Sequence, residues 1–214
     1  MNYAFFDDKT NEQFLPFTFT RPVCDLRLGI LTLREKWEKV LNVKTTTVAK
    51  EYLAAKYPYQ VNDEEDCIFI NGSVCPSPEL IEKVQQLSPN EGITFEGSLI
   101  AINNGKSKFS FAKFSMKKLV KQHELQAHFL KINHVWDLFA KNAEAIAMDF
   151  VLLTAGRTSM PISRSNKYVN PEWIFIEEGA SVECAVLNAK DGPIYIAKDA
   201  EVMEGSLIRG PFAL

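Results

Sequence analysis

Apolar residues follow two kinds of pattern along the first 160 residues. Continuous apolar runs at residues 3–6 and 67–70 are typical of buried strands, and the Glu96-Gly97 turn separates two shorter strands. Helical spacing of apolar residues occurs in four segments, and one further apolar run predicts a last buried strand. The predicted helices cover residues 28–41, 78–87, 116–131 and 134–147, and the predicted strand covers residues 150–154. Strands that alternate with helices in this way predict an α/β fold with a mostly parallel sheet covered by helices.

Two of the predicted helices carry start signals. Thr32 and Glu35 have the spacing of a capping box, in which each side chain bonds the backbone of the other residue. Ser77 followed by Pro78 places an N-cap residue before a proline at the first helical position. These signals predict where both helices begin.

A period of six residues appears in the tail. Ile176 and Val182 are six apart, Ile196 and Val202 repeat them 20 residues later, and Ile208 continues the spacing. Between the two copies, Val186 follows Val182. A six-residue period predicts a parallel β-helix built from hexapeptide turns, with a protruding loop near residues 191–193. Two acidic β-hairpins are the alternative, but they require a period of two.

The tail has room for about two coils of such a β-helix, whereas stability needs about three repeats and a cap at each end. We therefore expect that the chain is truncated, or that its open end is covered by a partner or by the chain itself. Truncation is the favoured expectation.

Charge and composition refine this organisation. Lys and Arg number 24 and Asp and Glu 27, a net charge of −3, which argues against a nucleic-acid or anionic-membrane partner. Residues 171–214 hold 8 acidic and 3 basic residues, net −5, which leaves 1–170 with 21 basic and 19 acidic, net +2. This shift, in a Ser-, Pro- and Arg-rich stretch, predicts two domains, 1–163 and 164–214. The N-terminus does not have the pattern of a signal peptide, and the four cysteines are widely spaced, so a cytoplasmic location is expected.

Ligands of α/β sheets bind beyond the carboxyl ends of strands, so the segments after Phe6, Ile70 and Leu153 are the candidates. Neither a dinucleotide-binding nor a P-loop glycine fingerprint is present. The first segment leads to hydroxyl and guanidinium groups suited to phosphate: Thr18, Thr20, Arg21 and Arg27. Pairing of the two arginines with Asp25 and other surface acids remains an alternative.

Several motifs together resemble one family. They are Leu15-Pro-Phe-Thr-Phe-Thr-Arg-Pro-Val23, Ile70-Asn-Gly-Ser-Val-Cys-Pro76, Val135-Trp-Asp-Leu-Phe139, Asp191-Gly-Pro-Ile-Tyr-Ile196 and Ile208-Arg-Gly-Pro211. The chain resembles a sugar nucleotidyltransferase-like family whose members join a Rossmann-like nucleotidyltransferase domain to a left-handed β-helix. The bifunctional N-acetylglucosamine-1-phosphate uridylyltransferase/acetyltransferases have this arrangement.

The resemblance implies transfer of a nucleotidyl group from a nucleoside triphosphate to a sugar 1-phosphate, with Mg²⁺ and release of pyrophosphate. It assigns Arg21 to catalysis with Thr18 and Thr20 on the phosphates, and it makes Arg27 a second basic candidate. Asn71, Gly72 and Ser73 fall where relatives have a Gly-Asp turn whose aspartate holds the metal. Trp136 and Asp137 fall on the substrate side, and His134 beside them is a candidate for the sugar end of the cleft.

Two departures from the family pattern open a second hypothesis. The loop at residues 6–14 has no glycine, and Ser73 stands where the metal-binding aspartate is expected. Asp8, or its neighbour Asp7, is the candidate for the missing carboxylate, although a cap or turn role competes with metal binding. Arg21 and the net charge of +2 over residues 1–170 favour the first hypothesis, a sugar-1-phosphate nucleotidyltransferase, whereas the two departures favour the alternative. The alternative is a catalytically degenerate binding or scaffold domain attached to a hexapeptide-repeat acyltransferase whose remaining coils are missing, with a homotrimer possible through the β-helix.

Overall fold

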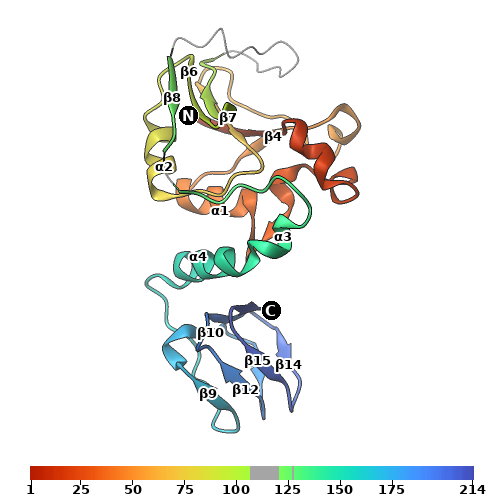
Figure 1. The fold of residues 1–214 in the computed structure, drawn as a ribbon, viewed down its shortest axis with the longest axis vertical. Helices are drawn as coiled ribbons and strands as arrows, with labels where there is room; N and C mark the ends of the chain where they lie inside the picture. The colour runs from red at the N-terminus through yellow and green to blue at the C-terminus, as the bar shows by residue number, and fades with distance from the viewer. Residues whose placement is uncertain (107–120, 127) are drawn as a thin grey trace. The chain divides into compact units, whose positions relative to one another are not determined.

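The computed structural model describes residues 1–106, 121–126 and 128–214 (Figure 1). Its contacts divide the chain into two compact units. The first unit comprises Met1–Arg27 and Thr32–Asp137, and the second comprises Leu28–Leu31 and Leu138–Leu214. The predicted boundary at 163/164 instead places residues 138–163 with the N-terminal domain, and it stays a prediction.

The first unit is built on a six-stranded mixed sheet in the order β4-β1-β5-β7-β6-β8. The β1–β4, β1–β5 and β6–β8 pairs are parallel, whereas β5–β7 and β6–β7 are antiparallel. This arrangement agrees with the predicted α/β class and mostly parallel sheet. The strands are β1 (Asn2–Phe6), β4 (Thr46–Val48), β5 (Cys67–Asn71), β6 (Glu91–Phe95), β7 (Ser98–Asn103) and β8 (Lys121–Glu124).

Alternation along the central strands supplies both faces of the sheet. Phe5, Ile68 and Ile70 point to a core that also contains Trp37 and Leu80 from two helices. The opposite face carries residues such as Ala4, Phe6 and Phe69, and the half-buried Tyr59 and Val61 pack against it. Successive side chains of a strand point to opposite faces, so a continuous apolar run such as β5 is buried on both sides.

The two capped helices begin as their signals predict. Helix α1 (Leu33–Leu41) has Thr32 as N-cap with both hydrogen bonds of the capping box to Glu35. It is shorter than the predicted 28–41, because β2 (Arg27–Leu28) and β3 (Leu31–Thr32) precede it. Helix α2 (Pro78–Gln85) has Ser77 as N-cap. The described chain also contains short 3₁₀ turns: η1 (Lys9–Phe14), η2 (Phe17–Phe19), η3 (Val23–Asp25), η4 (Glu51–Leu53) and η7 (Pro171–Trp173).

Two predicted elements are wrong. The apolar run at residues 150–154 is not a strand but the end of helix α4 (Asn142–Thr154), which follows the short helix α3 (Asp137–Ala140). A continuous apolar run does not distinguish a buried strand from a buried helix. The predicted helix at 116–131 is also wrong where the structure describes it, because residues 121–124 form β8. Its lysines at positions 117 and 118 lie outside the described residues.

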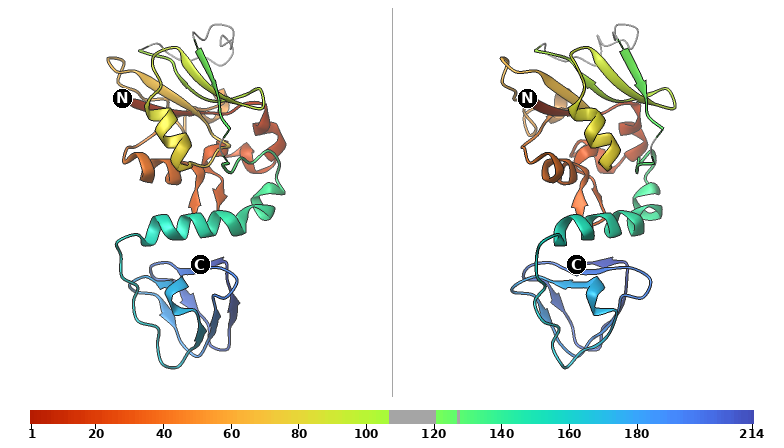
Figure 2. Two further views of the ribbon diagram at one scale, coloured as in Figure 1. Left: turned by 60° about the vertical axis from the view of Figure 1, so that its left-hand side comes forward. Right: turned by 90° about the vertical axis from the view of Figure 1, so that its left-hand side faces the viewer.

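The strands of the second unit form three short parallel sheets around one core (Figure 2). The pairs Ile176–Ile196 and Val182–Val202 confirm the 20-residue offset. The sheet orders are β10-β13-β16, β11-β14 and β15-β12-β9. Their strands are β9 (Lys167–Val169), β10 (Ile174–Ile176), β11 (Ser181–Val182), β12 (Val186–Asn188), β13 (Ile194–Ile196), β14 (Glu201–Val202), β15 (Leu207–Arg209) and β16 (Phe212–Ala213).

The strand that follows Val182 turns a leucine into the core. Val186 is half-buried, whereas Leu187 is fully buried and pairs with Ile208, 21 residues later. Leu187 lies five residues after Val182, whereas Ile208 lies six residues after Val202, so this step of the repeat is one residue short of six and a leucine fills the core at this level.

Helix α4 holds the segment Leu28–Leu31 within the second unit. The Asp149 carboxylate accepts hydrogen bonds from the backbone N–H groups of Ile30 (2.8 Å) and Leu31 (3.0 Å). Gly29 has a φ of +79°, and a Cβ there would lie 2.6 Å from Asp149 Oδ2. Glycine is required because both the backbone conformation and the close approach exclude a side chain.

In the described residues, the helices are all too short or too polar to cross a lipid bilayer.

Candidate functional site

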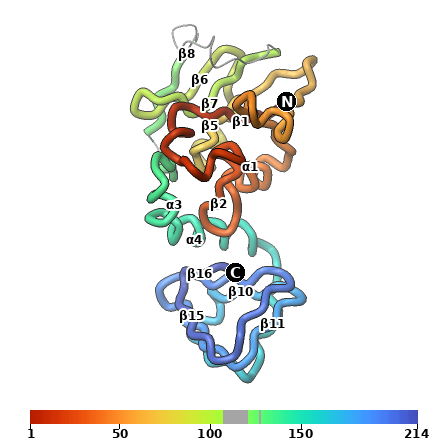
Figure 3. Tube along the Cα trace, turned by 90° about the vertical axis from the view of Figure 1, so that its right-hand side faces the viewer, coloured from red at the N-terminus to blue at the C-terminus, as the bar shows by residue number. Residues whose placement is uncertain are grey.

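The carboxyl ends of β1 and β5 lie side by side (Figure 3). These strands are parallel, and Phe6 pairs with Asn71, so the Asp7-Asp8 pair and the Gly72-Ser73 turn follow at the same edge. The segments after Phe6 and Ile70 therefore meet at one edge of the sheet. The third predicted segment, after Leu153, does not follow a strand, because Leu153 lies in α4.

Asp8 both caps a helical turn and faces β5. Its Oδ1 accepts hydrogen bonds from the backbone N–H (2.8 Å) and hydroxyl (2.5 Å) of Thr10, as the N-cap of η1. Its Oδ2 accepts a hydrogen bond of 2.8 Å from Asn71 Nδ2. The cap role anticipated for this residue is thus present, and it orients one carboxylate oxygen toward the turn after β5.

Asn71 and Ser73 belong to the hydrogen-bond network that orients Asp8. The Ser73 hydroxyl and backbone N–H both donate to Asn71 Oδ1, at 2.7 Å and 3.0 Å. Asn71 Nδ2 in turn donates to Asp8 and to the Leu99 carbonyl. Both residues are about 1% exposed. The Ser73 hydroxyl is therefore turned toward Asn71 rather than toward solvent.

Gly72 lets three segments approach one another. Its N–H donates to the Phe6 carbonyl at 2.9 Å. A Cβ at this position would lie 3.0 Å from Asp7 Oδ1 and 3.1 Å from the backbone nitrogen of Cys24. A larger residue would push the β5 turn away from Asp7 and from the segment that contains Cys24.

Asp7 is the most perturbed carboxyl of the site. Burial raises the pKa of Asp7 to about 6, even though hydrogen bonds from the Val23 backbone N–H and the Asn11 side chain lower it. The neighbouring Asp8 charge raises this pKa further, and Lys50 lowers it. Asn11 Nδ2 donates to Asp7 at 2.8 Å, while the buried Asn11 Oδ1 has no hydrogen-bond partner among the described residues. Perturbed acids and unsatisfied polar atoms concentrate at functional sites.

Sequence reasoning missed Asn11. The available signal was its position four residues after Asp7, in a polar loop that follows a buried strand.

The four hydroxyl and guanidinium candidates occupy different environments. Thr18 is fully buried, and its hydroxyl donates to the Asn11 carbonyl at 2.8 Å. Thr20, Arg21 and Arg27 are exposed. Thr18 therefore stabilises the loop, whereas Thr20 and Arg21 are exposed to solvent. They precede Val23, whose backbone N–H donates a hydrogen bond to the Asp7 carboxylate.

The segment at residues 130–137 lies beside the β5 turn. Ile132 N–H donates to the Ser73 carbonyl at 2.9 Å. The buried Asp137 accepts hydrogen bonds from the backbone N–H groups of Asn133 and His134, so it stabilises the local turn. Trp136 is 66% exposed and stacks on the His134 ring, with centroids 4.4 Å apart. The exposed indole face is available for stacking with a ligand ring.

The donor set fits a hydrated Mg²⁺ rather than an enclosed metal site. Within the described ranges, no three His, Cys, Asp or Glu side chains converge as metal ligands. Mg²⁺ usually keeps several waters and binds one or two carboxylates together with substrate phosphates. Asp8, whose Oδ2 lies at the shared strand edge, is the residue that would hold it.

Comparison with known proteins identifies the family. Residues 3–158 match the family model described as sugar nucleotidyl transferase, which covers more than half of the chain. A search of curated proteins finds no match. The matched range includes every candidate side chain at the strand edge, from Asp7 to Asp137. The chain therefore belongs to the sugar nucleotidyl transferase family.

Proposed function

We propose that the first unit transfers a nucleotidyl group from a nucleoside triphosphate to a sugar 1-phosphate. In this reaction a phosphate oxygen of the sugar 1-phosphate attacks the α-phosphorus, the bond to the bridging oxygen of the β-phosphate breaks, and pyrophosphate leaves. The observation that supports this proposal is the Asp8–Asn71 contact at the shared carboxyl edge of β1 and β5. It gives an oriented carboxylate next to the loop that carries Thr20 and Arg21.

Each candidate residue has a role in the proposal. Arg21 contacts the phosphates, with Arg27 as a second cation and the Thr20 hydroxyl as a donor. Thr18, Asn71, Gly72 and Ser73 fix the loop and the turn that face the nucleotide. Trp136 stacks against the substrate, and Asp137 holds the turn that presents it. Mg²⁺, held by Asp8, would neutralise phosphate charge when bound.

The test is nucleotide binding. We expect one of UTP, dTTP, CTP or ATP, with Mg²⁺, to stabilise the protein by about 2.7 kcal/mol at 100 times its Kd. Arg21→Ala should abolish this stabilisation and the pyrophosphate release that follows addition of sugar 1-phosphate. Arg164→Ala, an exposed arginine outside the matched range, is the control and should leave both unchanged. If the nucleotide stabilises Arg21→Ala as much as the wild type, Arg21 does not belong to the site. If no nucleotide stabilises the wild-type protein, the proposed enzyme activity is wrong.

A scaffold function is the second candidate, and the Ser73 contact favours it. The hydroxyl at the family's metal position is engaged with Asn71, and both Asp8 oxygens already accept hydrogen bonds. In this proposal residues 164–214 form the first coils of a left-handed β-helix that belongs to a longer acyltransferase and assembles as a homotrimer. The parallel pairing of β10–β13 and β11–β14 at an offset of 20 residues supports the β-helix. A cytoplasmic location remains part of both proposals, and the four free cysteines are compatible with it.

A further inference from the structure

Arg34 is a largely buried arginine on helix α1, and its whole guanidinium is engaged by the protein. Nε donates to Asp25 Oδ1 at 2.5 Å, and one terminal nitrogen donates to the Thr45 carbonyl (3.3 Å) and hydroxyl (3.1 Å). The other terminal nitrogen donates to the Thr47 hydroxyl and to Cys24 Sγ (3.2 Å). A guanidinium has five N–H groups, and these contacts use all of them. Arg34 is therefore not placed to bind a ligand itself.

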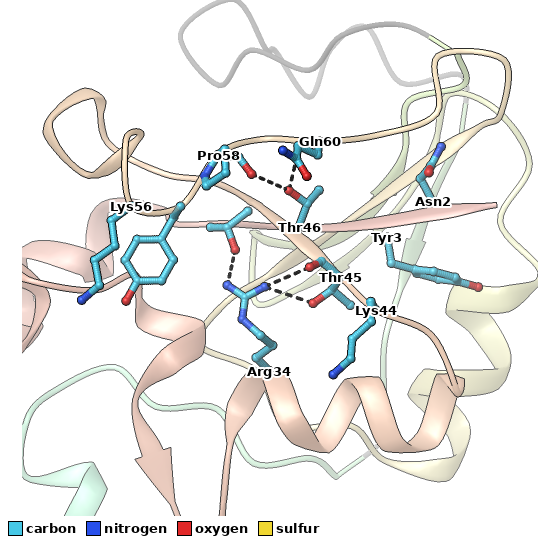
Figure 4. Close-up of a pocket in the computed structure, with 11 residues that line it drawn as sticks. Asn2, Tyr3, Arg34, Lys44, Thr45, Thr46, Lys56, Pro58 and Gln60 are labelled. Carbon is cyan, nitrogen blue, oxygen red and sulfur yellow. Dashed lines mark hydrogen bonds between the residues drawn. The ribbon is translucent and has the colours of Figure 1, made fainter.

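These contacts join two separate segments of the first unit. The two threonines belong to the edge strand β4 and to the residue before it, and Arg34 reaches them from α1 (Figure 4). The aspartate and the cysteine belong to the 3₁₀ turn η3. The guanidinium also lies over the Phe5 ring of β1, 5.5 Å from its centroid. Arg34 therefore ties η3 to the sheet.

The other side of η3 contacts the strand-end site. The Val23 backbone N–H donates to the two carboxylate oxygens of Asp7, at 3.2 Å and 3.3 Å. The Cys24 backbone lies so close to the turn after β5 that a Cβ on Gly72 would be 3.1 Å from its nitrogen. A 3₁₀ turn of three residues has few hydrogen bonds of its own, so tertiary contacts set its position. Arg34 thus holds η3 from one side, and the strand-end residues hold it from the other.

Pro22 links η3 to Arg21. It immediately precedes the turn and has a φ of −69°. The pyrrolidine ring fixes this angle, and it also restricts the backbone of the residue before the proline. The backbone of Arg21 therefore follows the position of η3.

The chemistry of the Arg34–Asp25 pair indicates a role in geometry. The two side chains are 16% and 19% exposed. Removal of two charges from water costs free energy that an ion pair regains only with good geometry, so such a pair is weak evidence for stability. A planar fork of five donors, in contrast, specifies direction as well as distance. The pair is therefore better suited to fixing where η3 lies than to strengthening the fold.

We propose that Arg34 is a positioning residue for nucleotidyl transfer, which holds η3 where Arg21 meets the phosphates of the nucleotide. Arg34 acts through η3 and Pro22 and does not contact the substrate. This inference rests on the proposed function. Misplacement of a binding group by about 1 Å can cost about 100-fold in rate, so a loosened η3 should slow the reaction although Arg21 itself is unchanged.

The test is turnover by a variant that keeps the charge but loses the fork. Arg34→Lys retains an ammonium near Asp25, but it cannot direct five donors at two segments. The assay uses the stabilising nucleotide among UTP, dTTP, CTP and ATP, with Mg²⁺ and with glucose 1-phosphate or N-acetylglucosamine 1-phosphate. We expect the kcat of pyrophosphate release to fall about 100-fold and the nucleotide Kd to rise about tenfold. Lys39→Arg, the reciprocal change at an exposed position of the same helix, is the control and should keep both constants.

A second comparison separates positioning from stability. Val84→Ala leaves a cavity at a fully buried position on α2, so it should lower stability while the kcat of the folded protein stays at the wild-type value. Urea unfolding gives the folded fraction of each variant. If Arg34→Lys loses activity only in proportion to its folded fraction, the contact is structural and the positioning role is wrong.

Thr47→Val is the alternative variant if Arg34→Lys does not fold. It removes one acceptor of the guanidinium and should lower kcat about tenfold in fully folded protein, whereas an unchanged kcat would overturn the positioning role. The two proposals fail differently. If the wild type is active and the variants match it, only the positioning role is wrong. If the wild type neither binds a nucleotide nor releases pyrophosphate, the proposed function is wrong, and the positioning role is wrong with it.

Discussion

Two adjacent carboxylates at the end of β1 differ because of their surroundings. Asp8 caps η1 and bonds Asn71 at the strand edge, whereas Asp7 accepts hydrogen bonds from Val23 and Asn11. Burial dominates the pKa of Asp7 and raises it to about 6. A buried acid that favours its neutral form lowers stability when it is ionised, so its presence here is better explained by the organisation of the loop than by folding.

The raised pKa of Asp7 predicts a pH-dependent stability. The ordinary pKa of an aspartate is 3.8, whereas the pKa of Asp7 in the folded protein is about 6. The contribution of this carboxyl to stability is fully present below pH 3.8 and is lost as the pH rises through 6, a change of about 2–3 kcal/mol. Urea unfolding should therefore show Asp7→Asn gaining stability relative to wild type by this amount between pH 4 and pH 7.5. Asp63→Asn, an exposed carboxyl, is the control, and an equal pH dependence in both variants would contradict the prediction.

At the scale of elements, capping signals in the sequence predict where helices begin better than the repeat predicts which residues of the tail face the core. The capping box at Thr32 and the Ser77-Pro78 start are both present. In the tail the period of six identifies Val182 and Val202 as inward, but the next inward residue, Leu187, lies five residues after Val182 rather than six. The core therefore depends on turn geometry as well as on the repeat.

Alanine substitution at two neighbouring positions tests which of them faces the core. Leu187→Ala should lower the free energy of unfolding by about 2–4 kcal/mol, because it leaves a cavity among fully buried side chains. Val186→Ala should cost less than about 1 kcal/mol, since Val186 is half-buried. Urea denaturation of both variants measures the difference, and a larger loss of stability in Val186→Ala than in Leu187→Ala would contradict the inward position of Leu187.

At the scale of the whole molecule, the candidate chemistry and the repeat belong to different units. The strand-end residues lie in the first unit, while the three small parallel sheets lie in the second. The charge of the chain is divided similarly, because residues 171–214 carry net −5 and the remainder net +2. A less acidic N-terminal part is compatible with phosphate ligands, which a strongly acidic surface would repel.

This division predicts where a nucleotide acts. Hydrogen exchange with and without the stabilising nucleotide and Mg²⁺ should slow at residues 7–27 and 71–75, because ligand contacts suppress local opening there. Exchange at residues 174–209 should not change. Protection confined to the second unit would contradict a nucleotide site at the ends of β1 and β5.

The sequence by itself determined the features that depend on near neighbours along the chain. The buried strands β1 and β5, the starts of α1 and α2 and the 20-residue offset of the tail all follow from periodicity and capping. The location of a phosphate site near Arg21 and Asn71 stays a prediction from the family's motifs. The run at 150–154 was misassigned because its apolar pattern suits a buried helix as well as a strand.

Only the tertiary structure decided what each candidate side chain contacts. Asp8 and Asn71 are 63 residues apart in sequence, and their hydrogen bond exists because β1 and β5 pair in parallel. The inward Ser73 hydroxyl and the raised pKa of Asp7 likewise depend on burial by distant segments. Patterns along the chain record which residues avoid water, whereas desolvation and hydrogen bonding at a site depend on which segments the fold brings together.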